Sequence, residues 1–160
     1  FTLGLGSQVK GHIVRRFGMT WTPPAPRMRE YVLALRHIWD AWQNGVKLEF
    51  IGKHYQINLM PPLFNPGPIE DPDIKVYIAA VNPRMLRVAG ELCQGVLLHS
   101  FNTPKYTSEV VLPSLTEGAA KAGRSLEDIE ISGGGGRALA INVAVRHANV
   151  EDGVLIRIRM

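Results

Sequence analysis

Apolar and polar positions follow a helical period in the clearest segment of the chain, which starts at Pro26. Apolar side chains recur at spacings of three and four from Met28 to Trp42, with charged residues between them. This spacing predicts an amphipathic helix that packs one face on a core. Pro26 at its start and Asn44-Gly45 at its end are typical helix start and stop signals. The aromatic residues of this stripe are therefore expected in the core.

Shorter apolar runs predict strands that alternate with helices. The N-terminal segment FTLGLG is strand-like and ends in glycine. From Lys75 onward the predicted order is strand 75–81, helix 83–93, strand 95–99, helix about 104–122 and strand 129–132. Strands that alternate with helices form right-handed βαβ units and a parallel sheet. The predicted fold class is therefore α/β.

Residues 7–74 interrupt this alternation. A short helical turn is expected at 12–17, before a proline-containing loop. After the long helix, KLEFIGKHYQINL alternates with period two around Gly52-Lys53 and predicts a β-hairpin. MPPLFNPGPIEDPDI follows with five of the eleven prolines, which disfavours regular structure. The hairpin and this proline-rich loop are predicted to form an insertion on one face of the domain.

The two ends of the chain depart from an ordinary domain. The chain opens on Phe1 within a strand-like segment, so we interpret it as a piece of a larger protein. At the other end, GGGGRALAINVAVRHANVEDGVLIRIRM holds a glycine run and two strand-like segments, 138–146 and 154–159, which could pair as a β-hairpin. We predict one domain over 1–133 and an atypical tail over 134–160.

The composition is typical of a globular protein. Hydrophobic residues make up 46% of the chain, and 18 Lys and Arg against 14 Asp and Glu give a net charge of +4. This mild excess, without a run of like charges, gives nucleic-acid binding little support. No apolar run reaches the length of a membrane span and no signal peptide is apparent, so a cytoplasmic protein without a membrane partner is the simplest interpretation.

Cysteine and histidine usage excludes several kinds of site. Cys93 is the single cysteine, which rules out an intrachain disulfide and a CxxC site, and its apolar neighbours predict a buried thiol. The five histidines do not approach metal-ligand spacings such as HxxxH, so a metal site has no support. The GGGG run at 133–136 lacks a phosphate-loop pattern around it, and the serines lack a nucleophile elbow.

Ligands of α/β proteins bind at the carboxyl ends of the parallel strands. Ala79 and Ala80, at one predicted strand end, leave room for a flat ring or a sugar. The N–H groups that open the helix after Asn82-Pro83 could hold a phosphate. The alternative is a plain strand-to-helix turn in which Asn82 caps the helix. His99, at another strand end, could contact a substrate or transfer a proton, and the alternative is a structural histidine.

Four segments together carry a family resemblance. They are LGLGSQVKGHIVRRFGMTW, RMREYVLALRHIW, YIAAVNPRMLRVAGELCQGVLLHS and LPSLTEGAAKAGRSLEDIEISG. In this order they resemble the second half of a luciferase-like oxidoreductase, in the branch that uses the deazaflavin coenzyme F420. The resemblance runs from Phe1 to about Gly133. It implies a partial (β/α)8 TIM barrel, about half a barrel, in which FTLGLG, KVYIAAV, GVLLH and IEISG are strands four to seven. The family's usual acid/base residues would then lie in strands one to three, outside this chain.

The resemblance also implies a coenzyme site. The residues that would border the deazaflavin ring, its ribityl chain and its phosphate are Gly6, Ser7, Gln8, Ala79, Ala80, Val81, Asn82, Met85, Gly95, Val96 and Leu97. The family commonly has glycine where this chain has Asn82, so the Asn82 side chain is an addition beside the phosphate. His99 is the remaining candidate for a catalytic polar contact.

The implied function is hydride transfer between coenzyme F420 and a small organic substrate, in an oxidoreductase acting on CH-OH or CH-N groups or on paired donors. Two alternatives stay open. One is an FMN-dependent monooxygenase of the same superfamily, and the other is a non-catalytic remnant of a truncated barrel. The open strands of a half-barrel could also pair in a homodimer.

Overall fold

The computed structural model describes residues 1–133, so the predicted tail hairpin lies outside the described residues. The chain divides into two compact units. Within residues 1–133, the first unit consists of Phe1–Ser7 and residues 75–133, and the second is Gln8–Ile74. Each unit is built from its own helices and strands, and each is described separately below.

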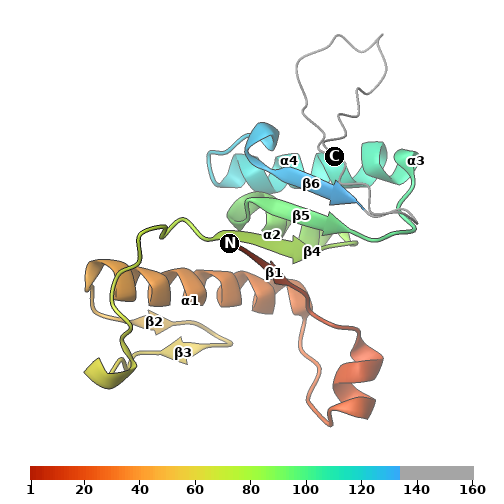
Figure 1. Cartoon of the computed structure of the whole chain (residues 1–160). Coiled ribbons are helices and arrows are strands. Elements are labelled where there is room, and N and C mark those ends of the chain that lie inside the picture. The colour runs from red at the N-terminus through yellow and green to blue at the C-terminus, as the bar shows by residue number, and fades with distance from the viewer. Residues whose placement is uncertain (134–160) are drawn as a thin grey trace. The chain divides into compact units, whose positions relative to one another are not determined.

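The first unit contains a four-stranded sheet in the order β1-β4-β5-β6 (Figure 1). Its strands are β1 (Thr2–Leu5), β4 (Lys75–Ala79), β5 (Gly95–Leu98) and β6 (Glu130–Gly133). Every neighbouring pair is parallel, which confirms the predicted α/β class. The strands β4 and β5 end one or two residues earlier than predicted, because the chain leaves the sheet before the Asn82-Pro83 helix start and before the loop at His99.

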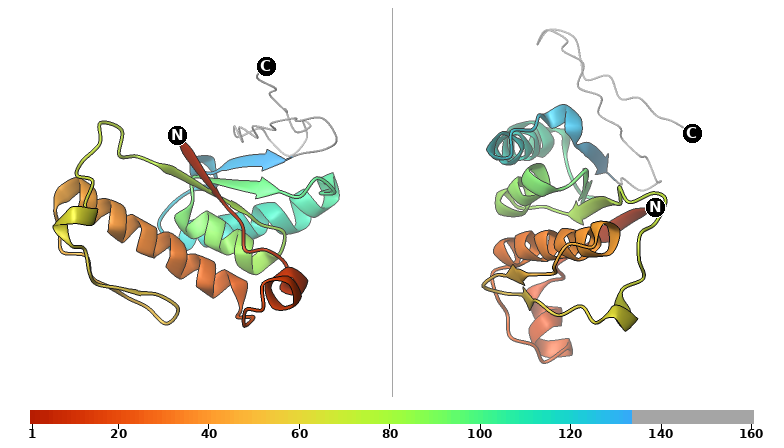
Figure 2. Two further views of the ribbon diagram at one scale, coloured as in Figure 1. Left: turned by 60° about the horizontal axis from the view of Figure 1, so that its bottom comes forward. Right: turned by 90° about the vertical axis from the view of Figure 1, so that its left-hand side faces the viewer.

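The helices of this unit cover one face of its sheet (Figure 2). They are α2 (Pro83–Leu92) and a continuous helical stretch made of α3 (Pro104–Tyr106), η3 (Thr107–Val111) and α4 (Leu112–Lys121), followed by the short turn η4 (Leu126–Asp128). Glycine permits α2 and α4 to pack closely, because a Cβ atom at Gly90 would overlap the carbonyl oxygen of Leu115. A Cβ atom at Gly118 would likewise overlap the carbonyl oxygen of Arg87.

The core lies between the sheet and these helices. Val76, Ile78 and Val96 are fully buried, and the strand register places them on the same face of neighbouring strands as Ile131. Burying each such side chain contributes about 1.5–3 kcal/mol. Cys93 is also buried, which confirms the prediction of a buried thiol. Residues at the alternate positions of the strands belong to the opposite face, and this second face carries the features described in the next section.

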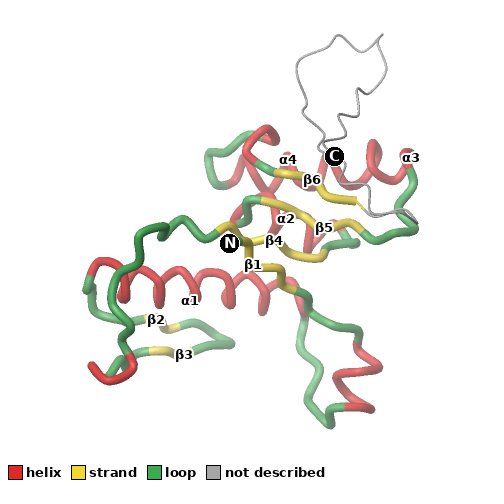
Figure 3. Tube along the Cα trace, viewed as in Figure 1, coloured by secondary structure: helices red, strands yellow, loops and turns green. Residues whose placement is uncertain are grey.

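The second unit is dominated by the predicted amphipathic helix, α1 (Pro24–Asn44). The residue after the helix, Gly45, caps its C-terminal end with a φ of +66°, a left-handed conformation that glycine adopts without strain. The π-helical turn η1 (His12–Arg16) confirms the short helical turn expected before it. Figure 3 shows the proline-rich segment as loop with one helical turn, η2 (Pro62–Phe64), in agreement with its composition.

The predicted β-hairpin of this unit is present, but it is short. Its strands are β2 (Phe50–Ile51) and β3 (Gln56–Ile57), and they pair antiparallel around the Gly52-Lys53 turn. The carboxylate of Glu30, from α1, accepts the backbone N–H groups of His54 at 2.6 Å, Lys53 at 3.1 Å and Tyr55 at 3.3 Å. The hydrogen bond from His54 is the main cause that lowers the pKa of Glu30 below its ordinary value. Glu30 therefore holds the hairpin turn on the helix.

Candidate ligand site at the carboxyl ends of the strands

The carboxyl end of β4 presents two kinds of side chain in alternation. Ala79 and Val81 are exposed, whereas Ala80 between them is only 2% exposed. The N–H of Ala80 continues the sheet by donating to the carbonyl oxygen of Leu97 at 3.1 Å. Ala79 and Val81 can therefore meet a ligand with their side chains, and Ala80 can meet one only with its backbone.

The turn from β4 into α2 leaves the Asn82 side chain unused in capping. Asn82 occupies the N-cap position with an extended backbone (φ −88°, ψ 150°), and its carbonyl oxygen accepts the N–H groups of Met85 and Leu86, both at 3.0 Å. Its side chain makes no capping hydrogen bond. The sequence left open that Asn82 caps the helix. Asn82 does occupy the N-cap position, but its side chain does not accept a hydrogen bond from the first turn of the helix. Its amide is exposed at the start of a helix, where the helix dipole favours negative charge.

The end of β1 lies beside the end of β4. A Cβ atom built on Gly6 would lie 4.0 Å from the Cβ atom of Ala79, an ordinary contact distance. Gly6 and Ala79 thus form a small, exposed patch without bulky side chains. Ser7, which follows, is half-buried.

Gln8 belongs to the second unit and has an unusual backbone. Its φ is +57°, and among residues 1–133 it is the single non-glycine residue in the left-handed region. Its side-chain oxygen accepts the N–H of Val9 at 3.3 Å and lies 3.1 Å from Nδ1 of His12. These local contacts hold a conformation that costs a non-glycine residue about 1–3 kcal/mol.

The predicted site residues on β5 and α2 are mostly inaccessible. Gly95 and Val96 are buried on β5, and Met85 on α2 is 7% exposed. Leu97 is the exception at 37% exposed, and it is in register with Ala79 and Ser132 on the open face of the sheet. Apart from the half-buried Ser7, the predicted residues therefore divide into an exposed group and a buried group, and the buried group can support a site only from beneath.

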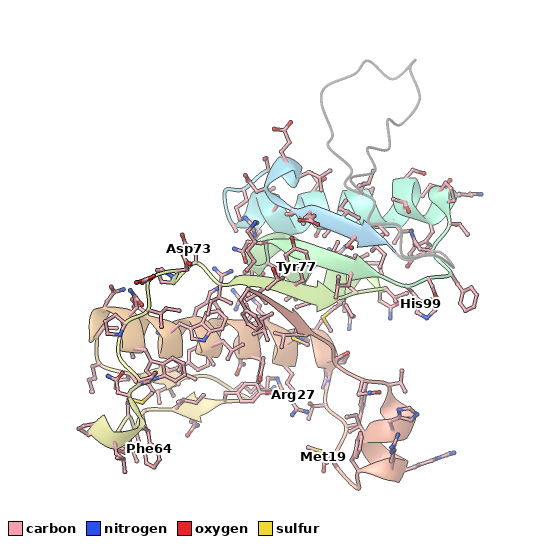
Figure 4. The ribbon with its side chains drawn as sticks, in the orientation of Figure 1. Met19, Arg27, Phe64, Asp73, Tyr77 and His99 are labelled. Atoms are coloured by element: carbon pink, nitrogen blue, oxygen red, sulfur yellow. The ribbon has the colours of Figure 1, made fainter. Side chains whose placement is uncertain are left out.

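His99 stands in the loop after β5, at the carboxyl end of the sheet (Figure 4). Its Nδ1 atom accepts the backbone N–H of Phe101 at 3.1 Å, and the two rings lie 5.4 Å apart between centroids. An Nδ1 acceptor requires the neutral tautomer with hydrogen on Nε2. His99 is exposed, so this Nε2–H group can donate to a ligand.

Tyr106 is a residue at this end that the sequence did not indicate. Its hydroxyl donates to the carbonyl oxygen of Val81 at 2.9 Å, which ties the helical stretch after β5 to the β4–α2 turn. A signal for it existed in the pair Thr103-Pro104, a typical helix start that places Tyr106 in the first turn.

The opposite, amino-terminal part of the same sheet face is closed by side chains. The Tyr77 hydroxyl donates to the Glu130 carboxylate at 2.5 Å, and its ring crosses over Gly95, where a Cβ atom would lie 2.5 Å from the ring. Burial, and then the hydrogen bond to Glu130, raise the pKa of Tyr77 to about 12. Figure 4 shows Tyr77 farther back along the strands, away from the strand end at which His99 lies.

Neither a metal site nor a membrane-spanning helix is found in the part of the chain that the structure describes. No group of three or more His, Cys, Asp or Glu side chains within residues 1–133 is arranged to hold a metal ion. None of the described helices combines the length and the apolar character that crossing a membrane requires.

Comparison with known proteins decides the family. Residues 1–154 match the family described as luciferase-like monooxygenase. The chain belongs to the luciferase-like monooxygenase family. Its first unit corresponds to consecutive β/α units of the partial (β/α)8 barrel that the sequence resemblance implied, so both the family and the fold class are confirmed.

Individual relatives of this family member include both unassigned and named proteins. The chain is 46% identical over 130 residues to an uncharacterized protein of Mycobacterium tuberculosis, covering 81% of this chain and 38% of that protein. It is 34% identical over 123 residues to the 5,10-methylenetetrahydromethanopterin reductase of Archaeoglobus fulgidus, covering 77% of this chain and 33% of the enzyme. The chain thus spans well under half the length of these curated relatives.

A solved structure supports the same relationship. The coenzyme F420-dependent tetrahydromethanopterin reductase of Methanopyrus kandleri superimposes with a TM-score of 0.61 at 26% identity. The match covers 82% of this chain and 40% of the reductase chain.

Proposed function

We propose that the chain is part of an oxidoreductase that binds coenzyme F420 at the carboxyl ends of β1, β4 and β5 and serves hydride transfer to or from a small organic substrate. The observation that carries the proposal is the small exposed patch of Gly6 and Ala79 beside the exposed Asn82 turn. The F420-dependent relatives support the choice of coenzyme.

The residues at this patch fit a flat, phosphate-bearing coenzyme. A ring system needs a surface without projecting side chains, and Gly6 with Ala79 provides one. A phosphate needs N–H donors near a helix start, and the backbone of Asn82 and Arg84 lies there. Leu97, in register with Ala79 on the neighbouring strand, and Val81, two residues further along the chain, add exposed apolar side chains.

Each residue of this chain has a distinct role in the proposal. When bound, coenzyme F420 supplies or accepts the hydride at carbon five of its deazaflavin ring. Gly6 and Ala79 set how closely the backbone approaches the ring, and Asn82 holds the phosphate end. His99 donates its Nε2–H to the substrate or the coenzyme and so orients it. Buried Ala80, Met85 and Val96 fix these backbones from beneath.

A titration of the whole chain with coenzyme F420 tests the proposal. We expect Ala79→Leu to weaken binding about fivefold or more, because a leucine side chain against the bound ring would cost about 1–3 kcal/mol. Ala120→Leu, on the exposed surface of α4, is the matched control and should bind as the unchanged chain does. Ala80→Leu is unsuitable, because leucine at a 2%-exposed position would disrupt the core itself.

Three results would contradict the proposal in different ways. If Ala79→Leu binds as tightly as the unchanged chain, the coenzyme does not lie against β4. If the chain binds FMN in preference to coenzyme F420, the monooxygenase alternative replaces the proposed one. If the folded chain binds neither, the proposed function fails for this chain.

A further inference from the structure

The β4–α2 turn receives a hydrogen bond from the side chain of Tyr106, which lies outside the turn. The Tyr106 hydroxyl donates to the carbonyl oxygen of Val81 at 2.9 Å. The backbone of Tyr106 is itself held, since its N–H donates to Oγ1 of Thr103, the N-cap residue, at 3.2 Å. The donor thus comes from a fixed helix start.

The loop that carries Tyr106 is tied together by its own hydrogen bonds. The Asn102 side-chain amide donates to Oγ1 of Thr107 at 2.5 Å, and the Thr107 hydroxyl donates to the carbonyl oxygen of Thr103 at 3.0 Å. The N–H of Asn102 donates to the carbonyl oxygen of His99 at 3.0 Å. These bonds join the loop after β5 into one ordered segment.

The bond to Val81 has a geometric consequence for the next N–H group. The Val81 carbonyl and the Asn82 N–H belong to one planar trans peptide unit, so they point in opposite directions. A donor that fixes the carbonyl therefore fixes the direction of the N–H. Within residues 1–133, the Asn82 N–H donates to no backbone carbonyl oxygen, so it is available to an incoming ligand.

We propose that Tyr106 is a positioning residue that aims the Asn82 N–H at the coenzyme phosphate by holding the Val81 carbonyl. The proposal rests on the proposed function for its ligand. The proposal also gives the hydrogen bonds within the loop after β5 a role, because that loop holds the Tyr106 hydroxyl against the β4–α2 turn.

A binding experiment compares Tyr106→Phe with the unchanged chain. The probes are coenzyme F420 and its phosphate-free deazaflavin chromophore. We expect Tyr106→Phe to weaken binding of the phosphate-bearing coenzyme about threefold to tenfold, the effect of one net hydrogen bond. Binding of the phosphate-free chromophore should not change. Tyr31→Phe, at an exposed tyrosine of α1, is the matched control. Equal affinity of Tyr106→Phe and unchanged chain for the coenzyme, or equal weakening for both probes, would overturn the proposal.

A second measurement on the ligand-free chain separates this proposal from the proposed function. Amide NMR of Tyr106→Phe should show an altered chemical shift at the Asn82 N–H, which shares a peptide unit with the Val81 carbonyl, with the amide shifts of β4 unchanged. If the unchanged chain binds no coenzyme, the proposed function fails, and the Asn82 amide still decides whether Tyr106 orients the turn. An unaltered Asn82 amide in Tyr106→Phe would show that it does not.

Discussion

The two ends of the four-stranded sheet use their residues in opposite ways. At the amino-terminal end, large and charged side chains satisfy one another, as in the Tyr77–Glu130 hydrogen bond above Gly95. At the carboxyl end, Gly6, Ala79 and Asn82 leave a small exposed surface with an amide that caps nothing. Barrel enzymes place stability at the first end and chemistry at the second. Substitutions at the two ends should therefore have separable effects, on stability at the first end and on ligand binding at the second.

Gly95 and Gly6 lie at opposite ends of the sheet, and alanine should destabilise the protein far more at Gly95 than at Gly6. In Gly95→Ala the new Cβ atom would lie 2.5 Å from the Tyr77 ring, which must move and give up Glu130. We expect a loss of about 2–3 kcal/mol in the free energy of unfolding. Gly6→Ala is the matched variant, with a nearest contact of 4.0 Å, and it should change stability by less than about 0.5 kcal/mol. Urea unfolding measures both free energies, and equal losses would show that Gly6 is packed as tightly as Gly95.

Arg124 binds backbone carbonyl groups at the C-terminal end of α2. Its guanidinium donates to the carbonyl oxygens of Gly90 at 3.0 Å, Cys93 at 2.8 Å and Asp128 at 3.2 Å. Arg124→Ala leaves these carbonyls without the donor, and we expect a loss of about 2 kcal/mol. Arg124→Lys should recover only part of it, because ammonium cannot reproduce the planar fork.

Arg84, at the opposite end of the same helix, is the control for Arg124. It is exposed in the first turn of α2, where a positive charge opposes the helix dipole. The free energy of unfolding of Arg84→Ala, measured by urea unfolding, should therefore lie within about 0.5 kcal/mol of that of the unchanged chain. If Arg84→Ala lost as much free energy of unfolding as Arg124→Ala, the C-terminal end of α2 would not be the end that an arginine stabilises.

Tyr77, at the closed end of the sheet, should titrate unusually late. Its pKa is raised from the ordinary 10.0 to about 12, so folding favours the neutral phenol. The stability that this preference contributes is fully present below pH 10 and is lost as the pH rises from 10 to 12. An ultraviolet titration should show one of the four tyrosines ionising at about pH 12. Glu130→Gln should bring that pKa down, and Tyr77→Phe should remove the late component. A titration curve unaffected by Tyr77→Phe would show that another tyrosine carries the shift.

The sequence predicted the elements well because their signals are local. The three-and-four spacing gave α1, the βαβ rhythm gave the parallel sheet, and period two around Gly52 gave the hairpin. It could not predict contacts between distant residues, such as Tyr77 with Glu130 or Tyr106 with Val81, because register and side-chain direction arise only in the packed sheet. The same reason explains why Ala79 and Ala80, adjacent and identical, were predicted alike although one is exposed and the other buried.

The smallest expected effect concerns two helix starts at the carboxyl end. Thr103 accepts the Tyr106 N–H on its side-chain oxygen, whereas Asn82 has no such bond. Loss of a working cap costs about 1 kcal/mol. Thr103→Ala should therefore lower the free energy of unfolding by about that amount, and Asn82→Ala by less than about 0.5 kcal/mol. If the two variants lose equal stability, the Asn82 amide caps α2 in solution. In that case the Asn82 side chain would serve stability, as the Tyr77–Glu130 hydrogen bond does at the other end of the sheet. The phosphate would then have to be held by backbone N–H groups alone.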